Sequence, residues 1–444
     1  MYSHLQKGRW LFFMKQTTKT VDFITLGCSK NLVDTEQAMQ QFRLNNFNIE
    51  WEQYTTVAEN VIINTCGFIG DAKEESVQTI LYFADLKEKG KIKKLYVVGC
   101  LVERYKKELA AEFPEVDGFY GVNFLPQLME EIHLQYYPNH LKTRVISTPP
   151  HYAYLKIAEG CNRQCSFCAI PSIRGKHSSK TIETILEEAK HLIANGVKEI
   201  ILISQDLVYY GKDNYGKFKL VELVDKLAQL DGLEWLRLHY LHPLFFDEAL
   251  LKIINKHKNI CRYIDIPIQH ISDNMLNLMQ RGISKVKTIE LLNRIRKKIP
   301  DAVIRTTLLV GHPGETRKDF NELKQFVKQF EFDRLGIFTY SHEENTPAYA
   351  MADTITQKTK EKRRDELMEI QQEIALSRNQ KMIGKSFKVL VDRVEEDYFV
   401  GRTEYDSPEV DNEVLIPIKN KLQIGQFYNV KIVDADIYDI IGEI

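Results

Sequence analysis

The first third of the chain alternates short apolar runs with stretches of helical periodicity. Strands are predicted at 21–26, 60–64 and 94–98, and helices at 32–45 and 72–89. Strands that alternate with helices pair in parallel, and the helices cover the sheet. The pattern therefore predicts an open parallel α/β domain over residues 20–135, followed by a proline-containing linker at 136–152.

Residues 153–341 repeat a strand followed by a helix about six times. The predicted strands are 154–158, 199–204, 235–239, 263–268, 303–310 and 336–340, and the predicted helices are 181–195, 218–230, 247–257, 272–299 and 316–330. Six parallel strands are too few to close an eight-stranded barrel. We therefore expect an open partial (β/α)6 barrel in a domain that spans 147–381 and ends in a charged amphipathic helix at 355–381.

Residues 382–444 differ in character, because Gly, Pro, Asp and Asn separate short strands. Strands are predicted at 386–392, 397–402, 413–418 and 427–433. This spacing is typical of a small β-barrel of roughly five strands. The predicted fold class is thus α/β, with an N-terminal open parallel domain, a central partial barrel and a small C-terminal β-barrel.

The composition is that of an ordinary globular protein. Apolar residues make up 44% and charged residues 27% of the 444 positions, and the formal net charge is −1. The longest strongly apolar run, at 10–14, is far shorter than the roughly 20 residues that cross a bilayer. No export signal is recognisable, so we expect a cytoplasmic protein with no membrane partner. Residues 1–13 precede the first strand and are treated as an extension outside the fold.

Grouped cysteines in the reducing cytosol indicate metal or redox chemistry, and this chain has seven cysteines. Three of them, Cys161, Cys165 and Cys168 (the barrel cysteines), directly follow the first strand of the predicted barrel. Thiolates are soft ligands that suit iron–sulfur or zinc sites. A cubane held by three thiolates keeps one iron open, and that iron can bind S-adenosylmethionine (SAM) and deliver an electron to it. The alternative is a structural zinc site with His177 as the fourth ligand.

A second set, Cys28, Cys66 and Cys100 (the sheet cysteines), lies in the first domain. Each member follows the carboxyl end of a predicted parallel strand. Such ends converge on one crevice of an open sheet, so these distant cysteines can meet there. Three thiolates again suit a cubane with one open iron. The alternative is three buried core cysteines, which is also our interpretation of the isolated Cys261.

Further strand ends carry candidate SAM contacts. They are Gln205 after the second barrel strand, Gln269 after the fourth, and Gly311 and Gly314 after the fifth. Glycine allows the backbone to approach a ligand closely. For the two glutamines, ordinary polar loop residues are the alternative.

The spacing of the barrel cysteines, with the aromatic Phe167 before the last of them, resembles the radical SAM superfamily. From about residue 20 onward the chain resembles the methylthiotransferase family, which joins a cluster domain, a radical SAM domain and a TRAM domain. The resemblance implies two 4Fe-4S clusters held by the six cysteines, SAM as cofactor, and Phe167 among the SAM contacts. The chain departs from the family at His312, where Phe is usual, and at Ser29, where Pro is usual.

One branch of that family modifies an adenosine of tRNA, and the other modifies an aspartate of small-subunit ribosomal protein number twelve. The segments 26–34, 66–69, 72–76 and 157–175 are similar to the ribosomal branch. The resemblance implies methylthio transfer to the β-carbon of that aspartate, with an electron-donor protein as a second partner. The rival hypotheses are a tRNA methylthiotransferase and an iron–sulfur electron carrier.

The charge of the C-terminal domain also favours a protein substrate. Residues 382–444 carry seven basic and thirteen acidic side chains, a net charge of −6. An acidic domain repels phosphate and attracts a basic protein, which makes tRNA an unlikely partner. Glu404, Asp406, Glu409 and Asp411 lie in one predicted turn and are the expected docking residues. An acidic face that is merely solvated is the alternative.

Overall fold

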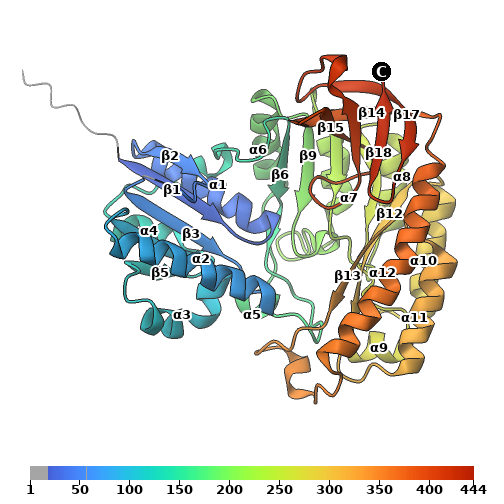
Figure 1. The fold of residues 1–444 in the computed structure, drawn as a ribbon, viewed down its shortest axis with the longest axis horizontal. Coiled ribbons are helices and arrows are strands. Elements are labelled where there is room, and N and C mark those ends of the chain that lie inside the picture. Colours follow the sequence, from blue (N-terminus) through green and yellow to red (C-terminus); the bar gives the residue numbers. More distant parts are fainter. Residues whose placement is uncertain (1–18, 57) are drawn as a thin grey trace, which may run out of the picture.

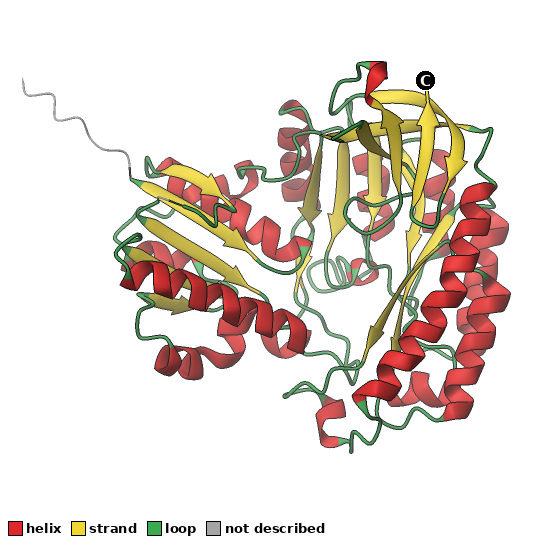
Figure 2. Cartoon of the chain, in the orientation of Figure 1, coloured by secondary structure: helices red, strands yellow, loops and turns green. Residues whose placement is uncertain are grey.

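The computed structural model describes residues 19–56 and 58–444. The extension expected at residues 1–13 lies outside the described residues. Three main sheets follow one another along the chain: a parallel sheet near the N-terminus, a second parallel sheet in the middle, and a closed barrel at the end (Figure 1). Helices line the outer side of the middle sheet (Figure 2).

The N-terminal sheet has five parallel strands in the order β2-β1-β3-β4-β5. Its elements are β1 (Thr20–Thr25), α1 (Ser29–Leu44), β2 (Asn48–Trp51), β3 (Asn60–Thr65), α2 (Gly70–Glu88), β4 (Lys94–Gly99), α3 (Cys100–Glu112), β5 (Gly118–Tyr120) and α4 (Leu125–Glu131). One apolar cluster under α2 and α3 includes Phe83 and Leu109, and another under α1 and α4 includes Phe42 and Leu128. The predicted open parallel α/β unit is confirmed.

The middle sheet has six parallel strands in the order β13-β12-β11-β10-β9-β6, which confirms the open partial barrel. Its strands are β6 (Tyr152–Lys156), β9 (Glu199–Ile203), β10 (Trp235–Leu238), β11 (Ile260–Asp265), β12 (Val303–Val310) and β13 (Arg334–Thr339). The helices α6 (Ile182–Ala194), α7 (Leu220–Ala228), α8 (Glu248–Lys256), α10 (Lys285–Lys298) and α11 (Arg317–Phe330) follow these strands. They bury a large aliphatic core against the outer face of the sheet.

The single helix expected at 272–299 is wrong. Two helices stand there, α9 (Asp273–Leu278) and α10, because Gln280 and Gly282 between them have φ values of +52° and +69°. Left-handed residues cannot continue a right-handed helix. The break lets α9 turn Met275 and Met279 into an apolar cluster that also contacts Phe167.

The C-terminal strands β14 (Ser386–Glu395), β15 (Tyr398–Thr403), β16 (Glu413–Pro417), β17 (Phe427–Ala435) and β18 (Asp439–Glu443) form a closed five-stranded barrel, as predicted. The amphipathic helix α12 (Gln357–Gln380) precedes it, and Leu367 on this helix is fully buried in the core of the middle unit. In the part of the chain that the structure describes, no helix is both long enough and apolar enough to span a bilayer.

The loop between β15 and β16 docks against the middle sheet. Asp406 accepts hydrogen bonds from Arg334 at 3.0 and 2.5 Å, and Tyr263 donates to Asp411 at 2.6 Å. Arg237 donates to the main-chain oxygen of Glu404 at 2.8 Å. Arg334 is the first residue of β13, so the loop covers the amino-terminal ends of the strands. The barrel cysteines follow β6 and therefore lie at the opposite ends.

The acidic loop is consequently not the exposed docking turn that the charge pattern predicts. Asp406 is fully buried, the Asp411 side chain is 2% exposed, and Glu404 is only partly exposed. Asp406 and Asp411 face the guanidinium groups of Arg334 and Arg305 in the middle unit. Glu404 accepts a hydrogen bond from the main-chain N–H of Arg262 at 3.2 Å. Glu409 is the exposed member of the set. Three of the thirteen acidic side chains counted for this domain, Glu404, Asp406 and Asp411, therefore serve an internal contact.

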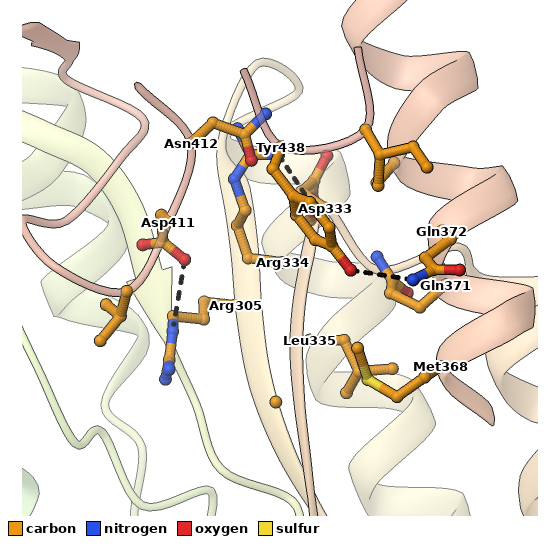
Figure 3. Close-up of a pocket in the computed structure, with 14 residues that line it drawn as sticks. Arg305, Asp333, Arg334, Leu335, Met368, Gln371, Gln372, Asp411, Asn412 and Tyr438 are labelled. Atoms are coloured by element: carbon orange, nitrogen blue, oxygen red, sulfur yellow. Dashed lines mark hydrogen bonds and ion pairs between the residues drawn. The ribbon is translucent and has the colours of Figure 1, made fainter. Parts of the chain in front are cut away.

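Figure 3 shows a cavity of about 120 Å³ beside this contact, between β13, α12 and the C-terminal barrel. Asp411 points toward Arg305 on one side, and the Tyr438 hydroxyl meets Gln372 at 3.0 Å on the other. None of the six grouped cysteines lines it. The cavity therefore belongs to the domain interface and not to the cysteine sites.

Candidate active site

The barrel cysteines lie in a tightly folded loop between β6 and the short helix α5 (Ile170–Arg174). The Cys161 N–H donates to the Gly175 oxygen and the Cys168 N–H donates to the Cys165 oxygen, each at 3.1 Å. Gly160 has a φ of +71°, and a side chain there would collide with the main chain at Lys176. Cys161 and Cys165 are buried and Cys168 is half-buried. The local backbone thus holds three thiols at the carboxyl end of β6.

The surroundings of these thiols suit a metal cluster. Burial raises the pKa of Cys161 to about 11 and that of Cys168 to about 12, so both remain protonated unless a metal displaces the proton. Arg281 is 4% exposed, and its Nη1 lies 3.1 Å from the Cys165 sulfur. Among the described residues no carboxylate pairs with Arg281, so its charge is directed at the sulfur. Three soft sulfurs beside a buried cation fit an anionic iron–sulfur cluster.

His177, the fourth ligand of the zinc alternative, is engaged elsewhere. Its Nε2 lies 3.0 Å from the Ser179 hydroxyl in the short strand β8 (Ser178–Ser179), and its ring packs against Tyr209 at 5.1 Å. Within residues 19–56 and 58–444, no three His, Cys, Asp or Glu side chains surround one position for a single metal ion.

The predicted SAM contacts lie around the same mouth of the barrel. Gln205 donates to Glu159 at 2.9 Å, and its side-chain oxygen is buried without a partner among the described residues. Gln269 has a φ of +70° and forms an isolated bridge to Leu308 of β12. Phe167 is part of the apolar wall formed with Met275 and Met279. All three therefore border the barrel-cysteine loop or the strand ends beside it, as the sequence predicts.

Gly311 and Gly314 have φ values of +79° and +88°, which explains why glycine is needed there. A side chain at Gly311 would collide with Lys360, and one at Gly314 would lie 2.8 Å from Leu278. Their close approach is thus to protein side chains, and contact with SAM stays a prediction. His312 between them is fully buried, and its Nε2 lies 2.9 Å from the Ser166 hydroxyl. His312, at which the chain departs from the family, therefore connects the loop after β12 to the barrel-cysteine loop through a hydrogen bond.

The sheet cysteines meet at one edge of the N-terminal sheet. They follow β1, β3 and β4, which are adjacent parallel strands. An added Cβ on Gly27 would lie 2.7 Å from the Cβ of Cys66, which leaves room only for glycine beside Cys28. Cys100 opens α3, and its sulfur lies 3.6 Å from the Asn31 side-chain oxygen. The predicted convergence of three distant cysteines is thus confirmed as geometry.

Charge and exposure differ among the sheet cysteines. Cys28 is exposed at the N-cap of α1, whereas Cys66 and Cys100 are buried. Burial raises the pKa of Cys100 to about 12, with Arg174 acting to lower it and the neighbouring Cys28 and Cys66 acting to raise it. Helix N-termini favour a thiolate, and two of these cysteines lie at such ends. The sheet cysteines therefore repel one another when they are ionised, whereas the dipoles of α1 and α3 favour the ionised form of two of them. A bound metal would relieve the repulsion, as expected of metal ligands.

The two cysteine sets are neighbours. Cys100 packs against Ala169 and Ile173, which directly follow the barrel cysteines. Four buried or half-buried charged groups connect the two units. Arg174 pairs with Asp34 at 3.0 Å and with Glu159 at 2.9 Å. Lys156 pairs with the same two carboxylates, and Asp34 is the member that belongs to the N-terminal unit. Arg174 also donates to Asn31, the residue beside Cys100. This charged quartet (Asp34, Lys156, Glu159 and Arg174) fixes the N-terminal unit against the barrel mouth.

The residues around the cysteines were only partly visible in the sequence. Asp34, Glu159 and Arg174 lie in segments that resemble the methylthiotransferases, so the resemblance was a usable signal for them. Arg281 follows α9 and lies far from either cysteine set in the sequence. No motif could have identified it, because its role depends on the helix break at Gln280.

Proteins of similar sequence cover nearly the whole chain. It is 52% identical over 427 residues to the ribosomal protein uS12 methylthiotransferase RimO of Phocaeicola vulgatus, which covers 96% of this chain and 99% of that protein. The chain belongs to the ribosomal protein uS12 methylthiotransferase family. The relative of the same name from Bacteroides thetaiotaomicron is 50% identical and covers 96% and 98% of the two chains. The chain is thus a radical SAM methylthiotransferase, and the electron-carrier and zinc-scaffold hypotheses lose their support.

Family models agree with this assignment, and solved structures share the fold. The Radical SAM superfamily model matches residues 155–327, the TRAM domain model matches 383–444, and a model described as Uncharacterized protein family UPF0004 matches 20–121. Radical SAM membership implies SAM and a 4Fe-4S cluster. The radical SAM methyltransferase TsrM of Kitasatospora setae aligns with a TM-score of 0.53 at 13% identity, covering 74% of this chain and 77% of that one. The cobalamin-dependent SAM radical enzyme OxsB aligns with a TM-score of 0.52 at 10% identity, covering 81% and 56%. At these identities the likeness shows the fold alone.

Proposed function

We propose that this enzyme transfers a methylthio group to the β-carbon of an aspartate in small-subunit ribosomal protein uS12. The observation that carries the proposal is the meeting of two three-cysteine sets at the junction of the N-terminal unit and the barrel. Two sets suit two separate tasks, sulfur delivery and radical generation. The names of the relatives at 50–52% identity support uS12 as the substrate.

The barrel cysteines would hold the cluster that cleaves SAM, and the sheet cysteines would hold a second 4Fe-4S cluster. When bound, the two groups supply a carbon-centred radical from SAM, which can abstract hydrogen from an unactivated C–H bond, and an iron that can carry the sulfur to be transferred. Acid–base catalysis alone could not activate such a bond, because it has no useful acidity. Gln205, Gln269, Gly311, Gly314 and Phe167 are the proposed SAM contacts.

The protein's own residues organise the reaction space. Arg281 donates to the Cys165 sulfur and stabilises negative charge there. His312 bonds Ser166, and burial lowers its pKa, so the imidazole stays neutral beside the loop. The charged quartet holds the sheet cysteines against the barrel mouth. These contacts fix the barrel-cysteine loop and its position beside the sheet cysteines.

We further propose three units, 20–135, 147–381 and 382–444, and an electron-donor protein as the second partner. The cytosol is the proposed compartment, because ribosomal proteins are assembled there. The tRNA alternative has no specific observation in its favour. The acidic C-terminal barrel argues weakly against it, since several of its carboxylates face arginines inside the molecule.

Mass spectrometry tests the proposal directly. Ribosomal protein uS12 and bulk tRNA are compared between cells with the gene, cells without it, and cells that carry a gene with the three barrel cysteines changed to Ala. We expect a methylthio group on one uS12 aspartate only when the intact gene is present. A methylthio group that is lost from tRNA and not from uS12 would refute the assignment.

A further inference from the structure

Lys30 is a buried cation at the junction of the two units. It is 6% exposed and is the second residue of α1, directly beyond Cys28 and Ser29. Its Nζ lies 3.2 Å from the centre of the Tyr240 ring, which follows β10 at the mouth of the barrel. The Lys30 side chain thus reaches from α1, which begins beside Cys28, to the barrel that carries the barrel cysteines.

This cation has no carboxylate partner. Across residues 19–56 and 58–444, no Asp or Glu lies within ion-pair distance of Lys30 and no hydrogen bond satisfies its ammonium group. Three other buried or half-buried cations of this region are paired, in contrast: Lys156 and Arg174 share two carboxylates, and Arg305 meets Asp265 at 3.2 Å. Lys30 Nζ is not one of the fully enclosed polar atoms of the described residues, so the ammonium group keeps contact with solvent while most of the side chain is buried against the Tyr240 ring. The position is therefore suited to an anion that arrives from outside.

The surroundings favour the same kind of ligand. The first turn of α1 contains no acidic residue and has no side-chain cap, so its free N–H groups add positive potential beside Lys30. Burial lowers the pKa of His239, and Arg237, Arg305, Lys30 and Arg402 lower it further. The three arginines are balanced by Glu199, Asp265 and Asp392, which leaves Lys30 without a carboxylate partner among the described residues. The His239 imidazole therefore stays neutral and is not a second cation that could bind the same anion.

We propose that Lys30 binds the side-chain carboxylate of the target aspartate and thereby determines the choice of that residue. The inference rests on the proposed function and adds to it the group that recognises the substrate side chain. In aspartate the carboxylate carbon is bonded directly to the β-carbon. A cation that holds the carboxylate therefore fixes the reacting carbon within one bond, between the two cysteine sets.

The test is equilibrium binding to the anaerobically reconstituted enzyme without reductant, so that no turnover occurs. The probes are purified uS12 and the same protein with its target aspartate, located by mass spectrometry, changed to Asn. Wild-type enzyme should bind the Asp form on the order of 10- to 100-fold more tightly than the Asn form, as expected for a charged hydrogen bond. Lys30→Met should reduce this ratio to about twofold or less, since Met keeps the volume and removes the charge. Lys30→Arg should keep most of the preference.

A matched control is Lys106→Met, because Lys106 also lies over an aromatic ring (5.8 Å from the centre of Tyr120) but is exposed on α3. It should leave the Asp/Asn ratio at the wild-type value. Iron content and SAM affinity are measured for each variant, because SAM also carries a carboxylate. If Lys30→Met lowers SAM affinity and keeps the Asp/Asn ratio, the anion is that of SAM and the inference is overturned.

The remaining outcomes separate this inference from the proposed function. A wild-type enzyme that binds both forms of uS12 equally well would overturn the role of Lys30 and leave the substrate intact. A wild-type enzyme that binds neither form would overturn the substrate assignment, and the inference with it.

Discussion

The contact between Asp406 and Arg334 should be one of the strongest single stabilisers of the C-terminal barrel. Asp406 is fully buried and accepts from Arg334 and from the Thr403 hydroxyl at 2.7 Å. In Asp406→Asn the shape is kept, but the buried Arg334 guanidinium loses its hydrogen-bonded carboxylate and keeps only the longer-range attraction of Asp411 on this loop. Removing one partner of a buried pair costs about 3–5 kcal/mol. At about 2–4 °C per kcal/mol, the midpoint of thermal unfolding should fall by roughly 6–20 °C.

The assay is thermal unfolding of purified enzyme, with Glu396→Gln as control. Glu396 is exposed in the turn between β14 and β15 and has no ion pair or hydrogen bond within the described residues. Its substitution removes one negative charge from the same domain and should change the midpoint by less than about 2 °C. The double variant Arg334→Met with Asp406→Leu should recover part of the loss, because no unpaired charge remains. A single variant Asp406→Asn that melts like the control would refute the reasoning.

Four shorter predictions follow from the site. Reconstituted enzyme should hold about eight irons, and changing the barrel cysteines to Ala should halve the iron and abolish SAM cleavage; stoichiometric zinc without iron would contradict the cluster assignment. Changing the sheet cysteines to Ala should also halve the iron and should abolish methylthio transfer, whereas normal turnover would make them core residues. Arg281→Met should lower the midpoint potential of the barrel cluster by on the order of 60 mV in an EPR-monitored titration, because a cation beside Cys165 favours the reduced state. Arg281→Lys should restore part of that potential, and an unchanged potential in Arg281→Met would rule out this role of Arg281. Burial lowers the pKa of His312 and His239, so the unfolded chain binds more protons than the folded chain as the pH falls. Between pH 6.5 and 5.5 each histidine should lower the free energy of unfolding by up to about 1 kcal/mol in urea unfolding, and a flat profile would argue against both.

The sequence predicts the elements whose apolar pattern is strong. The buried parallel strand β9 is a nearly continuous apolar run, and β12 has apolar residues at both of its ends; the prediction for β12 matches its bounds. The pattern misses β2, a short edge strand without a fully buried residue, and β5, which has only three residues. It also misses α4, a helix of seven residues, and α3, a helix of 13 residues that is kinked at Tyr105. Short elements are specified by their neighbours, and a local window cannot detect them.

The chemistry of the site was predictable and its supporting contacts were not. Thiols at strand ends can be read from spacing, because parallel strands end at one edge of a sheet. Arg281 and Lys30 act through contacts with residues far away in the sequence, at Cys165 and Tyr240. The charge count of the C-terminal domain was misleading for the same reason. It cannot distinguish a carboxylate such as Asp406, which faces Arg334, from one that faces solvent.

The charged quartet has a consequence for how the enzyme can move. If the N-terminal unit moved away from the barrel, Asp34 would be separated from Lys156 and Arg174. The barrel side would then carry a surplus of positive charge, and the N-terminal unit would carry the unpaired negative charge of Asp34. The same motion would pull Asn31 from Arg174 beside Cys100. Such an opening is expensive, so the spacing between sulfur delivery and radical generation is set when the chain folds. The substrate must adapt to that spacing by threading its own chain into it, and a flexible, extended segment of a protein meets that demand more readily than a rigid surface.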